Sequence, residues 1–123
     1  MNIGIFGSNN DSTIDGVVAE AAQAERDGFA SYWQSQIFGL DALSTLSVVG
    51  REVPRIELGT SVIPVYPRHP MMLAQQALTA NQAAGGRLTL GIGLGHKVVV
   101  EGMTNMSFDK PVRHMKEYLS ILM

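Results

Sequence analysis

The 123-residue sequence contains no cysteine. Disulfide bonds, thiolate metal sites and cysteine nucleophiles are therefore excluded. The sequence also lacks an apolar run long enough to span a membrane. It has no block of basic residues, since nine Lys and Arg stand against eleven Asp and Glu. We therefore expect neither a nucleic acid nor a membrane as the main partner.

The features of a secretory signal are missing as well. The first ten residues, MNIGIFGSNN, have neither the basic flank nor the long apolar run of a signal peptide, so we expect a cytoplasmic protein. Hydrophobic residues make up 46% of the chain and charged residues 16%, which is typical of a globular fold. The length predicts one domain, residues 1–123, with one modest core.

Two phosphate-binding motifs are absent from the most glycine-rich stretch, GGRLTLGIGLGHKVVVEG at residues 85–102. A dinucleotide fingerprint, Gly-x-Gly-x-x-Gly, would need its third glycine at the position of His96 or Val98. A P-loop would need a lysine directly after a glycine, but Lys97 follows His96. The glycines therefore need another explanation.

Short apolar strands alternate with helical patterns along the whole chain. The strands are predicted at residues 3–6, 30–33, 55–63 and 87–94, and the helices at residues 14–27, 42–53, 70–84 and 111–123. This alternation predicts a parallel sheet with right-handed crossovers. A closed eight-unit barrel typically needs about 250 residues, so four units correspond to half a barrel. An open doubly wound sheet is the alternative, and periodicity does not decide between the two.

Helix boundaries are marked by capping residues. Ser12 with Asp15 predicts a capping box, and Gly28 a left-handed stop. Asp41 is a predicted N-cap, and Pro70 a predicted first helical residue. In the last helix, four apolar residues are expected to face the core, namely Val112, Met115, Leu119 and Leu122.

Several short motifs resemble those of a known family. They are Gly59-Thr60-Ser61-Val62, His69-Pro70, Gly86-Arg87, Glu101 and the helix PVRHMKEYLSIL. Together they resemble the N-terminal half of the bacterial luciferase-like monooxygenase superfamily. The likeness is strongest to the branch that uses the deazaflavin coenzyme F420, which includes methylenetetrahydromethanopterin reductase and F420-dependent glucose-6-phosphate dehydrogenase. The resemblance implies an α/β fold of the (β/α)8 TIM-barrel type, of which this chain covers about the first four βα units.

The resemblance also implies a function. The chain would be an oxidoreductase, or the N-terminal part of one, that transfers hydride between reduced coenzyme F420 and a small organic substrate. One alternative is a monooxygenase of the same superfamily that uses flavin mononucleotide (FMN). A second alternative is an inactive half-barrel that self-associates. Half a barrel leaves two edge strands unpaired, and two copies that paired these edges would form a homodimer.

The resemblance assigns a cofactor site to the end of the third strand. In similar proteins a bulge there contains a non-prolyl cis peptide bond that backs the central ring of the cofactor. The corresponding bond joins Ser61 to Val62, and Thr60, Ser61 and Val62 would support the ring. Gly93 and Gly95, which have no side chains, would make room for it. The alternative is an ordinary strand end.

Polar residues at two other strand ends are further candidates. Where related dehydrogenases have a catalytic glutamate this chain has His96, and histidine suits proton transfer near neutral pH; the alternative is a loop histidine without chemistry. Gln36 and Ile37 stand where related enzymes often have an acidic residue and a histidine, so a general base is absent there. Gln36 would hydrogen-bond a cofactor edge or be a solvated loop residue.

Other conspicuous residues have simpler explanations. His69 is expected to cap a helix, and His114 to lie on the surface. Trp33 is expected to pack near the barrel mouth, with cofactor contact as the alternative. Met71 and Met72 are expected to pack within a helix layer. Three scattered histidines do not have metal-ligand spacing, so no metal site is expected.

The residues that follow the first strand allow two explanations. Ser8, Asn9 and Asn10 either turn the chain or contact a substrate.

Overall fold

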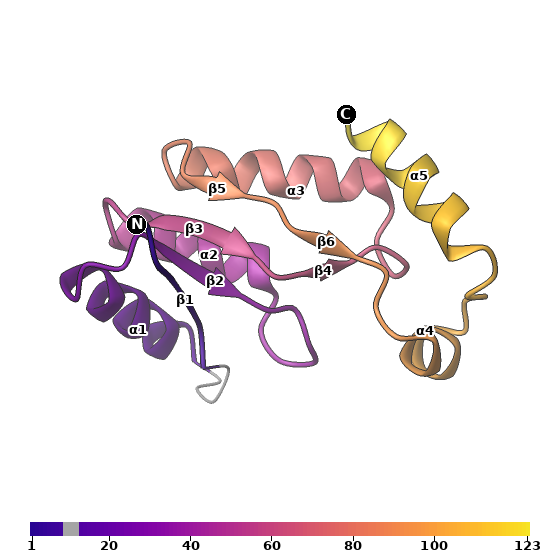
Figure 1. Ribbon diagram of the computed structural model, residues 1–123, viewed down its shortest axis with the longest axis horizontal. Coiled ribbons are helices and arrows are strands. Elements are labelled where there is room, and N and C mark those ends of the chain that lie inside the picture. The colour runs from indigo at the N-terminus through magenta and orange to yellow at the C-terminus, as the bar shows by residue number, and fades with distance from the viewer. Residues whose placement is uncertain (9–12) are drawn as a thin grey trace.

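The computed structural model describes residues 1–8 and 13–123 (Figure 1). In chain order the elements are β1 (Gly4–Phe6), α1 (Ile14–Arg26), β2 (Ser31–Gln34), α2 (Ala42–Glu52), β3 (Glu57–Thr60), β4 (Ile63–Pro64), α3 (Pro70–Ala83), β5 (Leu88–Thr89), β6 (Ile92–Gly93), α4 (Lys97–Thr104) and α5 (Pro111–Leu122). The predicted alternation of strands and helices is confirmed.

The strands that the structure describes pair in parallel throughout. Their order is β1-β2-β3-β5 in one sheet and β4-β6 in a second. Because β4 continues the third strand and β6 continues the fourth, the four strands lie side by side in the order of the sequence. Right-handed crossovers that all move in one direction leave their helices on one face of the sheet. A doubly wound sheet reverses its strand order at a switch point, and this order does not reverse. The arrangement is that of a barrel wall.

The third and fourth strands are each broken in two. Before the break Gly59 pairs with Thr89, and after it Ile63 pairs with Ile92. Three residues of the third strand therefore lie opposite two of the fourth, and one extra residue in a strand makes a β-bulge. The two continuous strands predicted for this region are wrong, because the extra residue has no partner in the ladder.

The first hydrophobic core lies between the sheet and the helices on its outer face. Tyr32, Leu46 and Leu58 are all 0% exposed. Side chains alternate along a strand, so Tyr32 points toward the helices, while Ser31 and Trp33 lie on the opposite, inner face of the half-barrel. Burying one large apolar side chain contributes about 1.5–3 kcal/mol, so this layer stabilises the first half of the fold.

A second hydrophobic cluster joins β4, α3 and the C-terminal helix α5. It contains Ile63, Leu73 and Tyr118, all buried. The predicted buried side of α5 is confirmed in part, because Met115 and Leu122 pack against this cluster. The remaining two predictions are wrong, since Val112 is 79% exposed and Leu119 is 39% exposed. Tyr118 takes the central position instead, and the buried stripe continues at a four-residue spacing to Leu122.

The helix boundaries agree largely with the predicted caps. The Asp41 carboxylate accepts a hydrogen bond from the Ser44 backbone N–H at 2.9 Å, and Gly28 has the left-handed φ of 84°. Both predictions are confirmed. Helix α1 begins behind Thr13, whose hydroxyl accepts from a backbone N–H. The predicted capping residue Ser12 lies outside the described residues.

Helix α4 and the methionines of α3 differ from expectation. Helix α4 was not predicted from the sequence. Its N-cap residue is His96, whose side chain makes no capping hydrogen bond. Met71 and Met72 are 57% and 45% exposed, so their predicted packing role is wrong. The buried side of α3 contains Leu73 instead. Among the described residues, no helix has the length and apolar character needed to cross a membrane.

Candidate active site

The C-terminal ends of the strands lie at the same end of the sheet (Figure 1). This end is called the strand-end edge. Because all the described pairs are parallel, the chain leaves β2, β4 and β6 at the same end. Pro64 of β4 pairs directly with Gly93 of β6, which brings the segment after Ser61 beside the glycine-rich segment. In parallel barrels this edge is where ligands bind.

The bulge at the end of β3 has the geometry that the resemblance implied. The peptide bond between Ser61 and Val62 is cis. The Ser61 backbone N–H donates to the Gln34 carbonyl at 2.8 Å, so the bulge stays attached to the end of β2. The Val62 side chain is 40% exposed. The bulge therefore presents an apolar surface at the strand-end edge.

Thr60 is fully buried and holds the bulge against the fourth strand. Its hydroxyl donates to the Gly91 carbonyl at 2.9 Å and accepts from the Gly91 backbone N–H at 2.8 Å. Both hydrogen-bonding functions of the hydroxyl are thus used within the protein. Thr60 can position the bulge, but its hydroxyl has no remaining proton to donate to a ligand.

Two glycines of the fourth strand face the bulge. A side chain on Gly91 would collide with the carbonyl of Thr60, and a Cβ on Gly93 would lie 2.5 Å from a methyl carbon of Val62. The missing side chains therefore make room, in the first place, for the neighbouring strand. The role of Gly93 in holding a cofactor stays a prediction.

Gly95 and His96 form the turn from β6 into α4. Gly95 has a φ of 76°, a conformation that side chains disfavour, and it has no close neighbour that would exclude a side chain. His96 is exposed and its carbonyl accepts from Val100 at 2.9 Å. Its imidazole is thus presented to solvent at the same edge as the bulge.

Gln36 has a role that the sequence did not indicate. Its side-chain oxygen accepts a hydrogen bond from the Ala42 backbone N–H at 2.7 Å. Together with Asp41 it therefore satisfies the free N–H groups at the start of α2. Neither of the two expected roles is needed to explain the residue, and contact with a cofactor edge stays a prediction.

Trp33 lies flat on the inner face of the half-barrel. Its indole N–H donates to the Ser31 hydroxyl at 2.8 Å. A side chain on Gly59 would collide with the benzene part of the indole, and a Cβ on Gly4 would lie 3.1 Å from the indole nitrogen. The ring therefore extends across all three strands, from β1 to β3. The predicted packing role is confirmed, but the indole reaches back to Ser31, toward the N-terminal ends of the strands and away from the mouth.

A polar contact at the first strand end was missed by sequence reasoning. Glu20 of α1 accepts from the Tyr32 hydroxyl at 2.7 Å and from the Ser8 backbone N–H at 3.0 Å. Burial, and then the hydrogen bond and charge of Glu20, raise the pKa of the Tyr32 hydroxyl. The contact ties the end of β1 to α1 and β2. Asn9 and Asn10, the candidates that follow Ser8, lie outside the described residues.

Arg68 connects the loop after β4 with the N-cap of α2 and with α3 and α5. Its guanidinium donates to the Asp41 carboxylate at 2.7 Å and to the Gln76 side chain at 3.1 Å, and its carbonyl accepts from the Tyr118 hydroxyl at 2.6 Å. Burial tends to raise the pKa of Asp41, but hydrogen bonds from Ser44 and Arg68 outweigh it and lower that pKa. Arg68 thus fixes the loop that follows the bulge.

The remaining histidines do not lie in the candidate site. His69 accepts from the Met71 backbone N–H at 3.2 Å, so its predicted capping role is confirmed. The surface position predicted for His114 is wrong, because α5 folds back onto the loop after β4. The His114 ring stacks on Tyr66 with centroids 4.3 Å apart, and Phe108 stacks on Tyr66 at 5.0 Å. In the described part of the chain, no three potential metal ligands cluster together.

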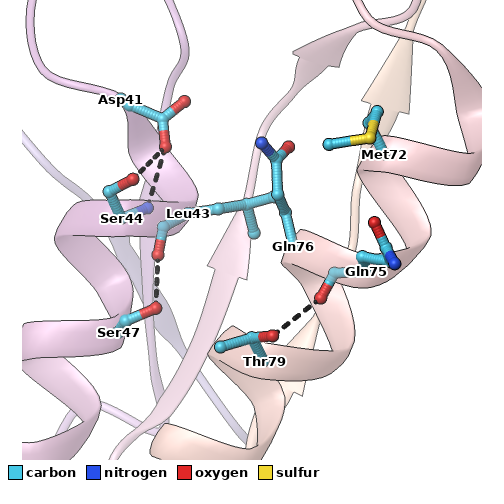
Figure 2. A pocket seen from close by; sticks show the side chains of 8 residues that line it. All are labelled: Asp41, Leu43, Ser44, Ser47, Met72, Gln75, Gln76 and Thr79. Carbon is cyan, nitrogen blue, oxygen red and sulfur yellow. Dashed lines mark hydrogen bonds between the residues drawn. The ribbon is translucent and has the colours of Figure 1, made fainter.

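A groove of about 270 Å³ lies between α2 and α3, and Figure 2 shows the side chains around it. It is lined by Asp41, Leu43, Ser44, Ser47, Met72, Gln75, Gln76 and Thr79. The hydroxyls of Ser47 and Thr79 donate to carbonyls within their own helices. None of the predicted site residues lines this groove, so it is separate from the strand-end edge.

Comparison with known proteins agrees with this geometry. The chain matches the family described as luciferase-like monooxygenase over residues 1–123. A protein of Mycobacterium tuberculosis named as a coenzyme F420-dependent oxidoreductase is 39% identical over 101 residues, which are 82% of this chain and 29% of that protein. The chain spans about a third of the length of the curated relatives it matches.

Two solved structures share the fold. One is the coenzyme F420-dependent tetrahydromethanopterin reductase of Methanopyrus kandleri, with a TM-score of 0.84, 20% identity, and coverage of 98% of this chain and 39% of that one. The other is the oxygenating constituent of 3,6-diketocamphane monooxygenase from Pseudomonas putida in complex with FMN, with a TM-score of 0.85, 20% identity, and coverage of 99% and 38%. The chain therefore belongs to the luciferase-like monooxygenase family, and its four βα units form about half of that family's (β/α)8 barrel.

Proposed function

We propose that this chain is the cofactor-supporting part of an oxidoreductase that transfers hydride between reduced coenzyme F420 and a small organic substrate. The observation that carries the proposal is the extra residue between Gly59 and Ile63, at the strand-end edge of a chain 39% identical to a relative named as a coenzyme F420-dependent oxidoreductase. Because the chain spans about a third of its relatives, the activity belongs to the proposal and is assigned to the complete barrel.

The residues at the strand-end edge fit a planar ring. The exposed side chain of Val62 offers apolar surface, which is typical of small-molecule sites. When bound, the deazaflavin would carry the hydride, while the protein orients the ring and excludes water. The backbone at Ser61 and Val62 would support one ring face, with Thr60 holding the bulge in place. Gly93 and Gly95 would leave space beside it.

His96 is the candidate for proton movement. Its imidazole is exposed at the strand-end edge and does not cap α4. It would exchange a proton with the substrate atom that gains or loses charge during hydride transfer. Gln36 and Ile37, at the end of the second strand, have no titratable group, so this chain offers no second acid or base there.

Cofactor binding tests the proposal directly. Coenzyme F420 is itself fluorescent, and its emission is to be followed as wild-type protein is added. Val62→Asp, which puts a charge against the ring, is expected to weaken binding at least about tenfold. Met72→Asp, at an exposed position of the outer groove, is the matched control and should bind like wild type. Equal affinity for all three proteins would contradict the role of the bulge.

A second candidate is an FMN-dependent monooxygenase. The observation that favours it is the similarity in fold to the FMN complex from Pseudomonas putida. A reduced flavin activates oxygen, whereas the deazaflavin does so poorly because carbon occupies the reactive ring position. Oxygen consumption with reduced FMN, compared with reduced coenzyme F420, separates the two. Uptake with FMN alone would favour the monooxygenase.

Self-association is part of the proposal for the isolated chain. In the described residues β1 and β5 form the two edges of the larger sheet, and unpaired edges promote pairing between chains. Two copies that paired these edges would form a homodimer with eight strands. This association does not require the homodimer to be an active enzyme. Light scattering that shows a stable monomer at micromolar concentration would contradict this. The cytoplasmic location expected from the sequence stays a prediction.

A further inference from the structure

We propose that the outer surface of α2 and α3 is an interface at which the chain binds the same surface of a second copy. The surface consists of the groove in Figure 2 and of the exposed side chains Met71 and Leu78 of α3, and it is called the α2–α3 face. It is separate from the strand-end edge and from the edges of the sheet. The inference therefore stands whether or not the chain binds a cofactor.

The first observation is that this face lacks charge. Helix α3 has no Asp, Glu, Lys or Arg among its 14 residues, and in α2 the charged residues stand only at the C-terminal end. On α3, Met71, Gln75 and Leu78 follow one stripe, and Leu78 is 70% exposed. A helix whose outer side faces water normally has charged residues there. The helices on either side do have them, namely Asp15, Glu20, Glu25 and Arg26 in α1 and Arg113, Lys116 and Glu117 in α5.

The second observation is that the rest of a barrel would not cover this face. Helix α2 contacts α1 and α3, and helix α3 contacts α2 and α5, so both already have a helix on each side. Further βα units would join the wall at its open edges, β1 and β5. Because the helices form the outer ring of a barrel, these units would lie beside α1 and α5. The α2–α3 face therefore stays exposed in the complete barrel.

The groove itself offers little to a polar ligand. The hydroxyls of Ser47 and Thr79 donate to carbonyls of their own helices, and the Ser44 hydroxyl donates to the Asp41 carboxylate. The charge of Asp41 is paired with Arg68 at 2.7 Å. A sugar or an ion would therefore find few free partners among these groups. An apolar side chain that fills the space between the two helices fits the groove better.

The lack of charge also indicates which surface binds here. A charged partner would lose hydration without gaining an ion pair, whereas a second α2–α3 face is uncharged as well. Its methionines adapt to an irregular groove, and the Gln75 amide, which both donates and accepts, can pair with its own copy. Interfaces are enriched in methionine and depleted of charge at their core. Two-fold dimers join the same patch of both copies, so a second copy of the chain is the occupant.

Charges of either sign at the middle of the face test the interface. Gln75→Glu and Gln75→Lys keep the size of the side chain, and each variant brings two like charges together when two copies meet. Sedimentation velocity should show self-association of the wild-type chain that is weaker by about tenfold or more in each variant alone. An equal mixture of the two variants should associate nearly as well as wild type, because opposite charges then face each other.

A truncation and a matched pair of controls complete the experiment. Met72→Ala removes an apolar side chain of the groove and should weaken association about three- to tenfold. Gln23→Glu and Gln23→Lys place the same charges at an exposed position of α1 and should associate like wild type, both alone and mixed. Thermal unfolding of each variant checks that the protein is folded, and the mixture of the two Gln75 variants provides a gain of association that misfolding does not produce.

The outcomes separate this interface from pairing at the sheet edges. Weaker association of each Gln75 variant, with recovery in the mixture, supports the α2–α3 face. Association that the Gln75 variants leave unchanged would belong to the sheet edges and would overturn the inference. A wild-type chain that stays monomeric at micromolar concentration, or a mixture that associates no better than either variant alone, would overturn it as well.

Discussion

On the outer face of the sheet, Tyr32 and Leu58 are completely buried beneath the helices, whereas on the inner face and at its rim Phe6 and Val62 leave 52% and 40% of their surfaces exposed. The two faces belong to the same strands, because successive side chains of a strand point to opposite faces. The outer face is therefore built for stability, since it forms a closed apolar layer. The inner face points into the barrel, of which this chain forms about half, so its apolar side chains lack the neighbours that a complete barrel interior supplies.

The strongest test of this comparison is a truncation in the outer layer. Leu46 is 0% exposed and belongs to the first core cluster. Leu46→Ala should lower the free energy of unfolding by about 2–5 kcal/mol, because it removes buried contacts and leaves a cavity. Urea unfolding measures the change. Val62→Ala at the exposed bulge should cost less than about 1 kcal/mol, and equal losses in the two variants would refute the division between the faces.

The inner face can be tested by adding volume where the indole lies. Gly59→Ala puts a methyl group into the Trp33 ring, and relieving such an overlap costs about 1–3 kcal/mol. The ring should move off the sheet, so the tryptophan emission should shift to longer wavelength as the indole becomes more exposed. Gly102→Ala, where nothing approaches within 4 Å, is the control. Unchanged emission in Gly59→Ala would contradict the flat orientation.

A smaller effect is expected from a hydroxyl in the outer layer. Tyr32→Phe removes the hydrogen bond to Glu20 but keeps the buried ring. The expected loss of unfolding free energy is about 1–2 kcal/mol, because the bond involves a charged acceptor. Thermal unfolding compared with that of Glu20→Gln measures it. Additive losses in the double variant would show that the two side chains do not interact.

The smallest effect concerns the charge at the start of α2. The pKa of Asp41 is lowered in the folded protein, so its charge adds stability above the unfolded-state pKa of about 4, and this is lost as the pH falls through the lower folded value. Asp41→Asn keeps a capping oxygen but removes the charge. The variant should be less stable at pH 7 by under about 1 kcal/mol, and the difference should vanish toward pH 2. A difference that persists there would contradict the linkage.

Much of the fold follows from local sequence signals. The apolar strands, the cap at Asp41 and the left-handed Gly28 each act within a few residues, so the sequence predicts them. The cis peptide bond at Ser61–Val62 came from family resemblance, because local propensity does not indicate it. The bulge was not visible as a break in the strand, since apolar residues stand on both sides of it.

The interactions that were missed are those made over long distances in sequence. Gln36 looks like a loop residue until the start of α2 is seen beside it. His114 looks like a surface residue until α5 folds back onto Tyr66. Trp33 was expected near the barrel mouth, but its flat orientation depends on glycines from two other strands.

The extra residue of the third strand also determines the face of the sheet to which the side chains after it point. Leu58 and Ile63 are five residues apart, which in an uninterrupted strand would turn their side chains to opposite faces. Both are nevertheless fully buried in the helix-covered clusters. Deleting or inserting one residue within 60–62 would rotate Ile63 and Val65 into the barrel and lift α3 from its neighbours. The number of residues in this short segment therefore determines how the two halves of the chain pack against their helices.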